Sequence, residues 1–127
     1  MPRVFITRTF NRWMRKTGLS DKALRNAVAE MDQGLIDANL GGQVVKKRIG
    51  LPGRGKRGGV RTLVGTNYGD RWFFIFGFEK HERDNIDAKE LRALQVTTEA
   101  LLALNDRQIA IAIEDGTLLE IGHGDKT

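Results

Sequence analysis

The residues in this sequence best suited to chemistry are cations in the middle of the chain. The stretch GLPGRGKRGG, residues 50–59, carries Arg54, Lys56 and Arg57 among glycines, and Arg61 follows it. Lys80 and His81 come directly after an apolar run. Arginine and lysine donate hydrogen bonds to phosphate oxygens, glycine lets a backbone approach a ligand closely, and histidine exchanges protons near neutral pH. These residue types predict a site that holds phosphate groups and moves protons.

The stretch 50–59 comes close to the pattern of a nucleotide-binding loop, which is Gly, four residues, Gly and Lys. That pattern also requires Ser or Thr after the lysine to hold Mg²⁺, and a helix that begins inside the loop. Here Arg57 follows Lys56, and residues 60–64 are mostly β-branched and apolar, so the loop leads into a strand. The sequence favours a flexible basic loop between two strands, either a solvated surface or a contact for some other phosphate.

Charge is distributed unevenly along the 127 residues. Residues 41–83 hold ten basic side chains against three acidic ones, whereas residues 84–127 are net acidic. A concentrated basic region is expected of a protein that contacts nucleic-acid phosphates, because each neutralised phosphate releases counterions. The alternative is a basic surface that contacts only water.

Length, cysteine content and hydropathy limit the class of protein further. A chain of 127 residues fits one domain, and the absence of cysteine excludes disulfides and thiol catalysis. No window approaches the roughly 18 apolar residues of a membrane span, and the N-terminus lacks the apolar core of a signal peptide. Carboxylates and thiols are not clustered near the basic residues, which disfavours a metal site. We expect a soluble cytoplasmic protein with no membrane partner, no metal and no cofactor.

The elements that must position the basic residues follow from the apolar patterns. Strands are predicted at residues 3–7, 44–49, 60–66 and 72–78, and the last of these is apolar on both faces, as a central strand should be. Residues 39–42 are predicted to form a loop. A small extra strand is predicted at residues 117–121.

Helices are predicted between these strands. A short one contains Phe10, Trp13 and Met14, and a second is capped by Ser20 and carries apolar residues as far as Leu35. A third begins at the capping box of Asp87 and Glu90, and a short fourth follows Asn105. The fold class is therefore α+β, a small mostly antiparallel sheet flanked by helices, in the order β-α-α-β-β-β-α plus a C-terminal appendage.

The basic segments resemble toxins of the RelE/ParE superfamily, closest to the HigB-like members of the RelE branch. The resemblance rests on VKKR at residues 45–48, GKRGGVR at residues 55–61 and FEKHE at residues 78–82. It implies a RelE-like toxin domain over residues 1–105, with residues 106–127 as a C-terminal helix and strand appended to the same domain.

The resemblance also implies a function, that of a ribosome-dependent mRNA endonuclease. Such an enzyme cuts without a metal, because the 2′-hydroxyl of the RNA itself is the nucleophile. The implied catalytic residues are Arg57 and Arg61 on the phosphate, Lys80 in charge stabilisation or proton transfer, and His81 as base or acid. The implied RNA-binding residues are Lys46, Lys47, Arg54 and Lys56. The implied partners are a cognate antitoxin, the ribosome and mRNA, and the free toxin would be a monomer.

One departure and two alternatives accompany this interpretation. Several RelE-type enzymes place a tyrosine near the chain end to stack on or orient RNA, whereas the single tyrosine here, Tyr68, falls in a predicted turn. Either an aromatic residue such as Phe78 substitutes for it, or turnover depends more on the basic cluster. Trp13 and Trp72 occupy apolar positions that favour packing over base stacking. The alternatives are a ParE-like gyrase poison that acts by protein contact, and a non-catalytic RNA- or DNA-binding module with salt-dependent affinity.

Overall fold

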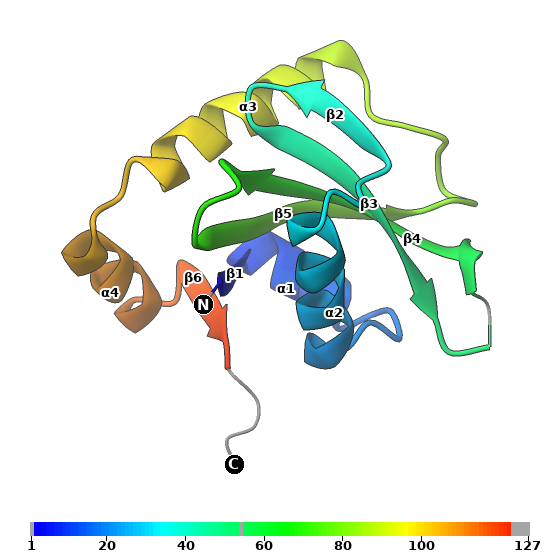
Figure 1. The fold of residues 1–127 in the computed structure, drawn as a ribbon, viewed down its shortest axis with the longest axis horizontal. Helices are drawn as coiled ribbons and strands as arrows, with labels where there is room; N and C mark the ends of the chain where they lie inside the picture. Colours follow the sequence, from blue (N-terminus) through cyan, green and yellow to red (C-terminus); the bar gives the residue numbers. More distant parts are fainter. Residues whose placement is uncertain (1, 54, 123–127) are drawn as a thin grey trace.

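The protein is built on one mixed sheet, shown in the computed structural model of Figure 1. The structure describes residues 2–53 and 55–122, and of residues 55–57 the backbone alone. The sheet has six strands in the order β2-β3-β4-β5-β1-β6. In the described residues the strands are β1 Arg3–Thr7, β2 Ala38–Gly41, β3 Val44–Leu51, β4 Gly55–Thr66, β5 Arg71–Glu79 and β6 Leu118–Ile121, and the helices are α1 Arg8–Met14, α2 Asp21–Asp32, α3 Ala88–Leu102 and α4 Asp106–Glu114.

Pairing in the sheet is mostly antiparallel, and β1 with β5 is the one parallel pair among the described strands. The α+β class with a mostly antiparallel sheet is therefore confirmed. The strand predicted to be central is confirmed as well, because β5 lies between β4 and β1 and its residues Trp72, Phe73, Phe74 and Ile75 are all buried.

Helices cover both faces of the sheet (Figure 1). On one face, α1 and α2 pack over a core that includes Val45, Val60 and Phe74. On the other, α3 and α4 pack over a core that includes Leu63 and Phe73. The predicted caps are confirmed: the Ser20 hydroxyl accepts from the Ala23 N–H, and Asp87 with Glu90 and Asn105 with Gln108 form capping boxes.

Two predicted elements are wrong. Residues 39–42 are not simply a loop, because β2 pairs with β3 and the turn between them has positive φ at Gly41, Gly42 and Gln43. The second helix ends at Asp32, and Leu35 lies beyond it with 55% of its surface exposed. With β2, α4 and β6 included, the order is β-α-α-β-β-β-β-α-α-β.

The predicted basic loop is much shorter than residues 50–59, since β3 continues to Leu51 and β4 begins at Gly55. The register of the two strands shifts between two residue pairs, Ile49 with Val60 and Leu51 with Gly55, and their backbones approach closely there. A Cβ atom at Gly59 would lie 2.0 Å from the Ile49 carbonyl oxygen. Residue 59 must therefore be glycine, because any side chain there would overlap the backbone of β3.

The C-terminal residues complete the sheet. The predicted strand at residues 117–121 is confirmed as β6, which pairs antiparallel with β1, and the Arg3 Nε atom lies 2.9 Å from a Glu120 carboxylate oxygen. Ile109 of α4 and Leu118 of β6 are buried in the core beneath α3. Residues 123–127 lie outside the described residues.

Candidate phosphate-binding site

A row of residues crosses three strands on the sheet face that α3 and α4 partly cover. Arg48 of β3 is the Cα partner of Arg61 in β4, which in turn is the partner of Phe78 in β5. Directly opposite residues of neighbouring strands point to the same face, so these three side chains form a line across the sheet. The parallel row consists of Lys46, Leu63 and Phe76. The sheet thus brings cations and aromatic rings together from segments separated in sequence.

Arg61 is the most unusual member of this row, because it is only 6% exposed. Its Nη1 atom is buried without a hydrogen-bond partner among the described residues. A buried donor without an acceptor costs about 1–3 kcal/mol. A planar guanidinium can donate two hydrogen bonds to the paired oxygens of a phosphate. The Arg61 Nη1 atom is therefore a hydrogen-bond donor that is already in place for an anion.

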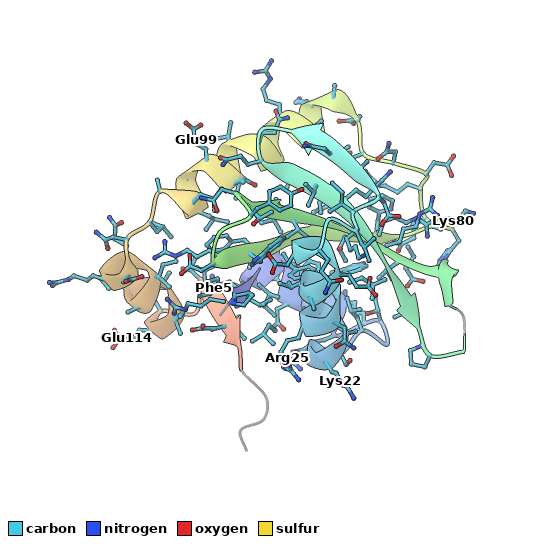
Figure 2. The ribbon with its side chains drawn as sticks, viewed as in Figure 1. Phe5, Lys22, Arg25, Lys80, Glu99 and Glu114 are labelled. Atoms are coloured by element: carbon cyan, nitrogen blue, oxygen red, sulfur yellow. The ribbon has the colours of Figure 1, made fainter. Side chains whose placement is uncertain are left out.

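A hollow of about 440 Å³ lies beside the first residues of β4 and the last residue of β5. It is lined by Gly58, Gly59, Lys80, His81 and Asp84. Lys80 projects from the right-hand end of the molecule in Figure 2. The His81 side chain is 73% exposed, with its Nδ1 atom 3.6 Å from a Glu79 carboxylate oxygen. Arg61 is two residues along β4 from Gly59, and Phe78 is two residues along β5 from Lys80. Arg61, Lys80 and His81 therefore share one end of the sheet.

Lys47 is placed apart from these residues. It lies on the opposite face, 3% exposed, where its Nζ atom is 2.7 Å from a Glu30 carboxylate oxygen and donates to the Leu35 carbonyl oxygen at 2.7 Å. This lysine ties the end of α2 and the following segment to β3. Arg54 lies outside the described residues, and so do the side chains of Lys56 and Arg57, whose backbones are part of β4.

Two cations near the site were not among the predicted catalytic or RNA-binding residues. Arg48 shares its face with Lys46 because side chains alternate along a strand, so the signal was present in the spacing. Arg83 lies after β5, with its guanidinium carbon 5.8 Å from the centre of the Phe76 ring and 6.0 Å from that of Phe78. Its place directly after a buried strand was a signal in the sequence, but its position over these two rings was not.

Arg83 also joins the segment after β5 to the start of α3. Its Nη1 atom donates to a Glu90 carboxylate oxygen at 2.6 Å, and the Asp87 backbone N–H donates to the same oxygen at 3.0 Å. These hydrogen bonds, the one from Arg83 foremost, lower the pKa of the Glu90 carboxyl, and the partner carboxylate raises the pKa of Arg83. Both residues stay charged near neutral pH and hold the segment that carries Lys80 and His81.

The aromatic residues have separate positions. Tyr68 is exposed at the far end of the β4 and β5 hairpin, with its ring edge-on to Trp72. Phe78 is 2% exposed, with Arg83 over its ring. Trp72 is fully buried, and Trp13 packs against Gly77, which fits the packing role expected of both tryptophans.

The fold and this cluster of cations define a small α+β protein with a basic surface at one end of its sheet. The comparison with protein families makes the class specific, since the family described as the RelE toxin of the RelE / RelB toxin-antitoxin system matches residues 2–121. The chain belongs to this family and is the toxin of a toxin–antitoxin pair, so the family implies a cognate antitoxin as partner. No curated protein matches the sequence. None of the described helices is long and apolar enough to cross a membrane.

Proposed function

We propose that this toxin is an endoribonuclease that cuts mRNA on the ribosome, in the manner of the HigB-like members of its family. The observation that carries the proposal is Arg61, a buried cation with an unpaired N–H group, on the same sheet end as Lys80 and His81. The family supports a toxin, and endoribonuclease activity is general in it. On this proposal the protein acts in the cytoplasm, where the ribosomes are, and is a monomer until its antitoxin binds.

The proposed reaction is a phosphoryl transfer within the RNA. The 2′-hydroxyl oxygen attacks the adjacent phosphorus, and the bond from phosphorus to the 5′-oxygen breaks, which leaves a 2′,3′-cyclic phosphate and a 5′-hydroxyl. One group removes the 2′-hydroxyl proton and another protonates the departing oxygen, and such acid–base help contributes about 10²–10⁴-fold in rate. Lys80 and His81, which line the hollow, are the side chains that exchange protons, and we assign both to this step without dividing the two roles.

Arginine supplies the remaining requirement, stabilisation of the crowded, charged phosphorus centre. It does not deprotonate in proteins, so Arg61 acts as a fixed donor. Arg57 is proposed to do the same from β4, and Arg54, Lys56 and Lys46 to contact the flanking RNA backbone. We leave Lys47 out of the RNA contacts because it is buried against Glu30 on the other face.

The decisive experiment adds purified protein to ribosomes translating a defined mRNA and maps new RNA ends at nucleotide resolution, with the same RNA free of ribosomes alongside. We expect ends only on the translated message and in codon register. Intact message would contradict the nuclease proposal. It would favour a gyrase poison or a protein that binds RNA without cleaving it.

Variants then test the site. Arg61→Ala and Lys80→Ala should each lower cleavage about 10²–10³-fold, because each removes a transition-state contact. Arg92→Ala, on the exposed side of α3, is the matched control and should cut like the unmodified toxin. Circular dichroism establishes that each variant is folded. Normal cleavage by both site variants would show that the reaction occurs elsewhere.

A further inference from the structure

Lys80 and His81 are the two central residues of a tight turn that follows β5. Glu82 closes this turn twice, because its backbone N–H donates to the Glu79 carbonyl oxygen at 2.9 Å and its carboxylate accepts from the Glu79 backbone N–H at 3.0 Å. The Arg83 backbone N–H donates to the same carbonyl oxygen at 3.4 Å. The turn therefore holds the side chains of Lys80 and His81 next to each other at the hollow.

A carboxylate lies beside the His81 ring. The Nδ1 atom is 3.6 Å from a Glu79 carboxylate oxygen, a distance that a small rotation of the exposed ring shortens to a hydrogen bond. The Glu79 side chain is 19% exposed and the imidazole 73%, so the enclosed carboxylate sets the position of the ring. The Nε2 atom, on the other side of the ring, has no partner in the part of the chain that the structure describes and is open to a substrate.

A carboxylate at Nδ1 determines where the imidazole carries its proton. In a neutral histidine one ring nitrogen holds a proton and the other is an acceptor, and the hydrogen bond that one nitrogen makes decides which is which. An ionised carboxylate only accepts, so it holds the proton on Nδ1 and leaves the lone pair of Nε2 free. It also stabilises the imidazolium that forms when Nε2 takes up a proton. The neighbouring Lys80, as an ammonium, has protons to donate and no lone pair.

We propose that His81 is the general base of the reaction and that Glu79 is its positioning residue. The inference rests on the proposed function and divides the two roles left open there. The Nε2 atom of His81 takes the proton of the 2′-hydroxyl as its oxygen bonds to phosphorus, and Lys80 gives a proton to the 5′-oxygen as the bond from that oxygen to phosphorus breaks. Exchange with water afterwards restores both side chains. Glu79 touches neither reacting oxygen and acts through the imidazole.

The contact between Glu79 and His81 is tested without RNA. Nitrogen-15 NMR of histidine rings distinguishes a proton on Nδ1 from one on Nε2, and the His81 signals are those missing from His81→Ala. At a pH where the ring is neutral, we expect the proton on Nδ1 in the unmodified toxin and a shift toward Nε2 in Glu79→Gln. Glu99→Gln, which changes an exposed carboxylate of α3, is the matched control and should leave the ring unchanged. The same tautomer in the unmodified toxin and in Glu79→Gln would overturn the positioning role.

Cleavage of ribosome-bound message tests the role of the base. Glu79→Gln should lower the rate about tenfold, a fraction of the 10²–10⁴-fold that general acid–base catalysis contributes. The double variant Glu79→Gln/His81→Ala should be no slower than His81→Ala alone, because the carboxylate acts only through the imidazole. A further loss in the double variant would show that Glu79 supports the turn and does not act through His81.

A message with sulfur in place of the departing 5′-oxygen separates the base from the acid, because a thiolate leaves without a proton. This sulfur should restore cleavage by Lys80→Ala and leave His81→Ala and Glu79→Gln as slow as before. Restored cleavage by His81→Ala would make this histidine the acid and overturn the inference.

Failure of the inference and failure of the proposed function give different results. Normal cleavage by both Glu79→Gln and His81→Ala would overturn the inference and leave the nuclease standing. Intact message with the unmodified toxin would remove the nuclease and the base together, whereas the NMR measurement would still decide whether Glu79 holds the His81 ring.

Discussion

Lys46 and Lys47 are neighbours in the sequence with opposite positions in the protein. Lys47 is buried against Glu30, whereas Lys46 lies on the face that carries Arg61. Side chains alternate along a strand, so a run of adjacent cations is always divided between two faces. A count of basic residues therefore overstates the charge that any one ligand can meet.

The difference can be measured with one substitution at each lysine. Lys47→Met keeps the length of the side chain but removes the ion pair with Glu30 and the hydrogen bond to the Leu35 carbonyl oxygen. We therefore expect the free energy of unfolding to fall by about 1–3 kcal/mol and RNA cleavage by the folded protein to be unaffected. Lys46→Gln should leave stability unchanged and weaken RNA binding. Urea unfolding and binding assays on both variants check this, and a binding defect in Lys47→Met with normal stability would contradict it.

Gly59 tests the interpretation of the glycine-rich motif. Because a Cβ atom there would overlap the Ile49 carbonyl oxygen, Gly59→Ala should lower the free energy of unfolding by about 1–3 kcal/mol, as overpacking does. Gly18→Ala is the control, since its Cβ atom would make only an ordinary contact with Pro52, and it should change stability by less than about 0.5 kcal/mol. Equal stability of the two variants in urea unfolding would show that β3 moves aside easily.

Some properties of single residues could be predicted from the sequence and others could not. The caps Ser20 and Asp87 each act through a neighbour three residues away, so local sequence was sufficient to identify them. The position of Arg83 over Phe76 and Phe78 depends on how an irregular segment returns across the sheet, which no local pattern specifies.

At the scale of elements, α4 and β6 cover the core at the β1 edge of the sheet. Ile109 is fully buried, whereas Ile111 on the same helix is 51% exposed. Ile109→Ala should therefore lower the free energy of unfolding by about 2–5 kcal/mol, and Ile111→Ala by no more than about 0.5 kcal/mol. The measurement is chemical denaturation followed by circular dichroism. Similar losses in the two variants would mean that α4 contributes to stability without docking through Ile109.

Elements with strong periodic or capping signals were predicted well, including the four long strands and the helix that begins at Asp87. The strand β2 was missed because its few residues include glycine and asparagine, which favour turns, and because its pairing with β3 supplies the order that its own sequence lacks. The extent of β3 and β4 through the basic motif was missed for the same reason.

At the scale of the whole molecule, charge is separated in space. Figure 2 shows Glu99 and Glu114 toward the left of the protein, Lys22 and Arg25 at the lower edge and Lys80 at the right. Helix α4, which carries Asp106 and Glu114, lies at the left of Figure 1, whereas the hairpin of β3 and β4 extends to the right. On the proposed function, this separation turns the basic end toward RNA before contact is made.

Such steering predicts a specific dependence on salt. The association rate constant with ribosomes that carry a stalled message should fall at least about tenfold between roughly 50 and 200 mM salt, with a smaller change in the dissociation rate constant. Stopped-flow fluorescence of labelled toxin measures both constants. An association rate that does not change with salt would show that charge does not guide the encounter.

The family and the fold class could be predicted from the whole chain, because the composition, the order of elements and the basic motifs agree with one another. The site could be predicted only in outline. Which cations share a face depends on the register of β3, β4 and β5, including the shifts near Ile49 and Leu63, and that register is a property of the folded sheet.

The position of β1 has a consequence for folding during synthesis of the protein. Of the described strands β1 is synthesised first, yet it lies between β5 and β6. Its partner Ile121 is the last residue of the matched family region. Contacts so distant in sequence form late, after the loop between them has closed. We therefore expect the nascent chain to lack its complete sheet until β6 has been synthesised and, on the proposed function, to be unable to cut a message before then.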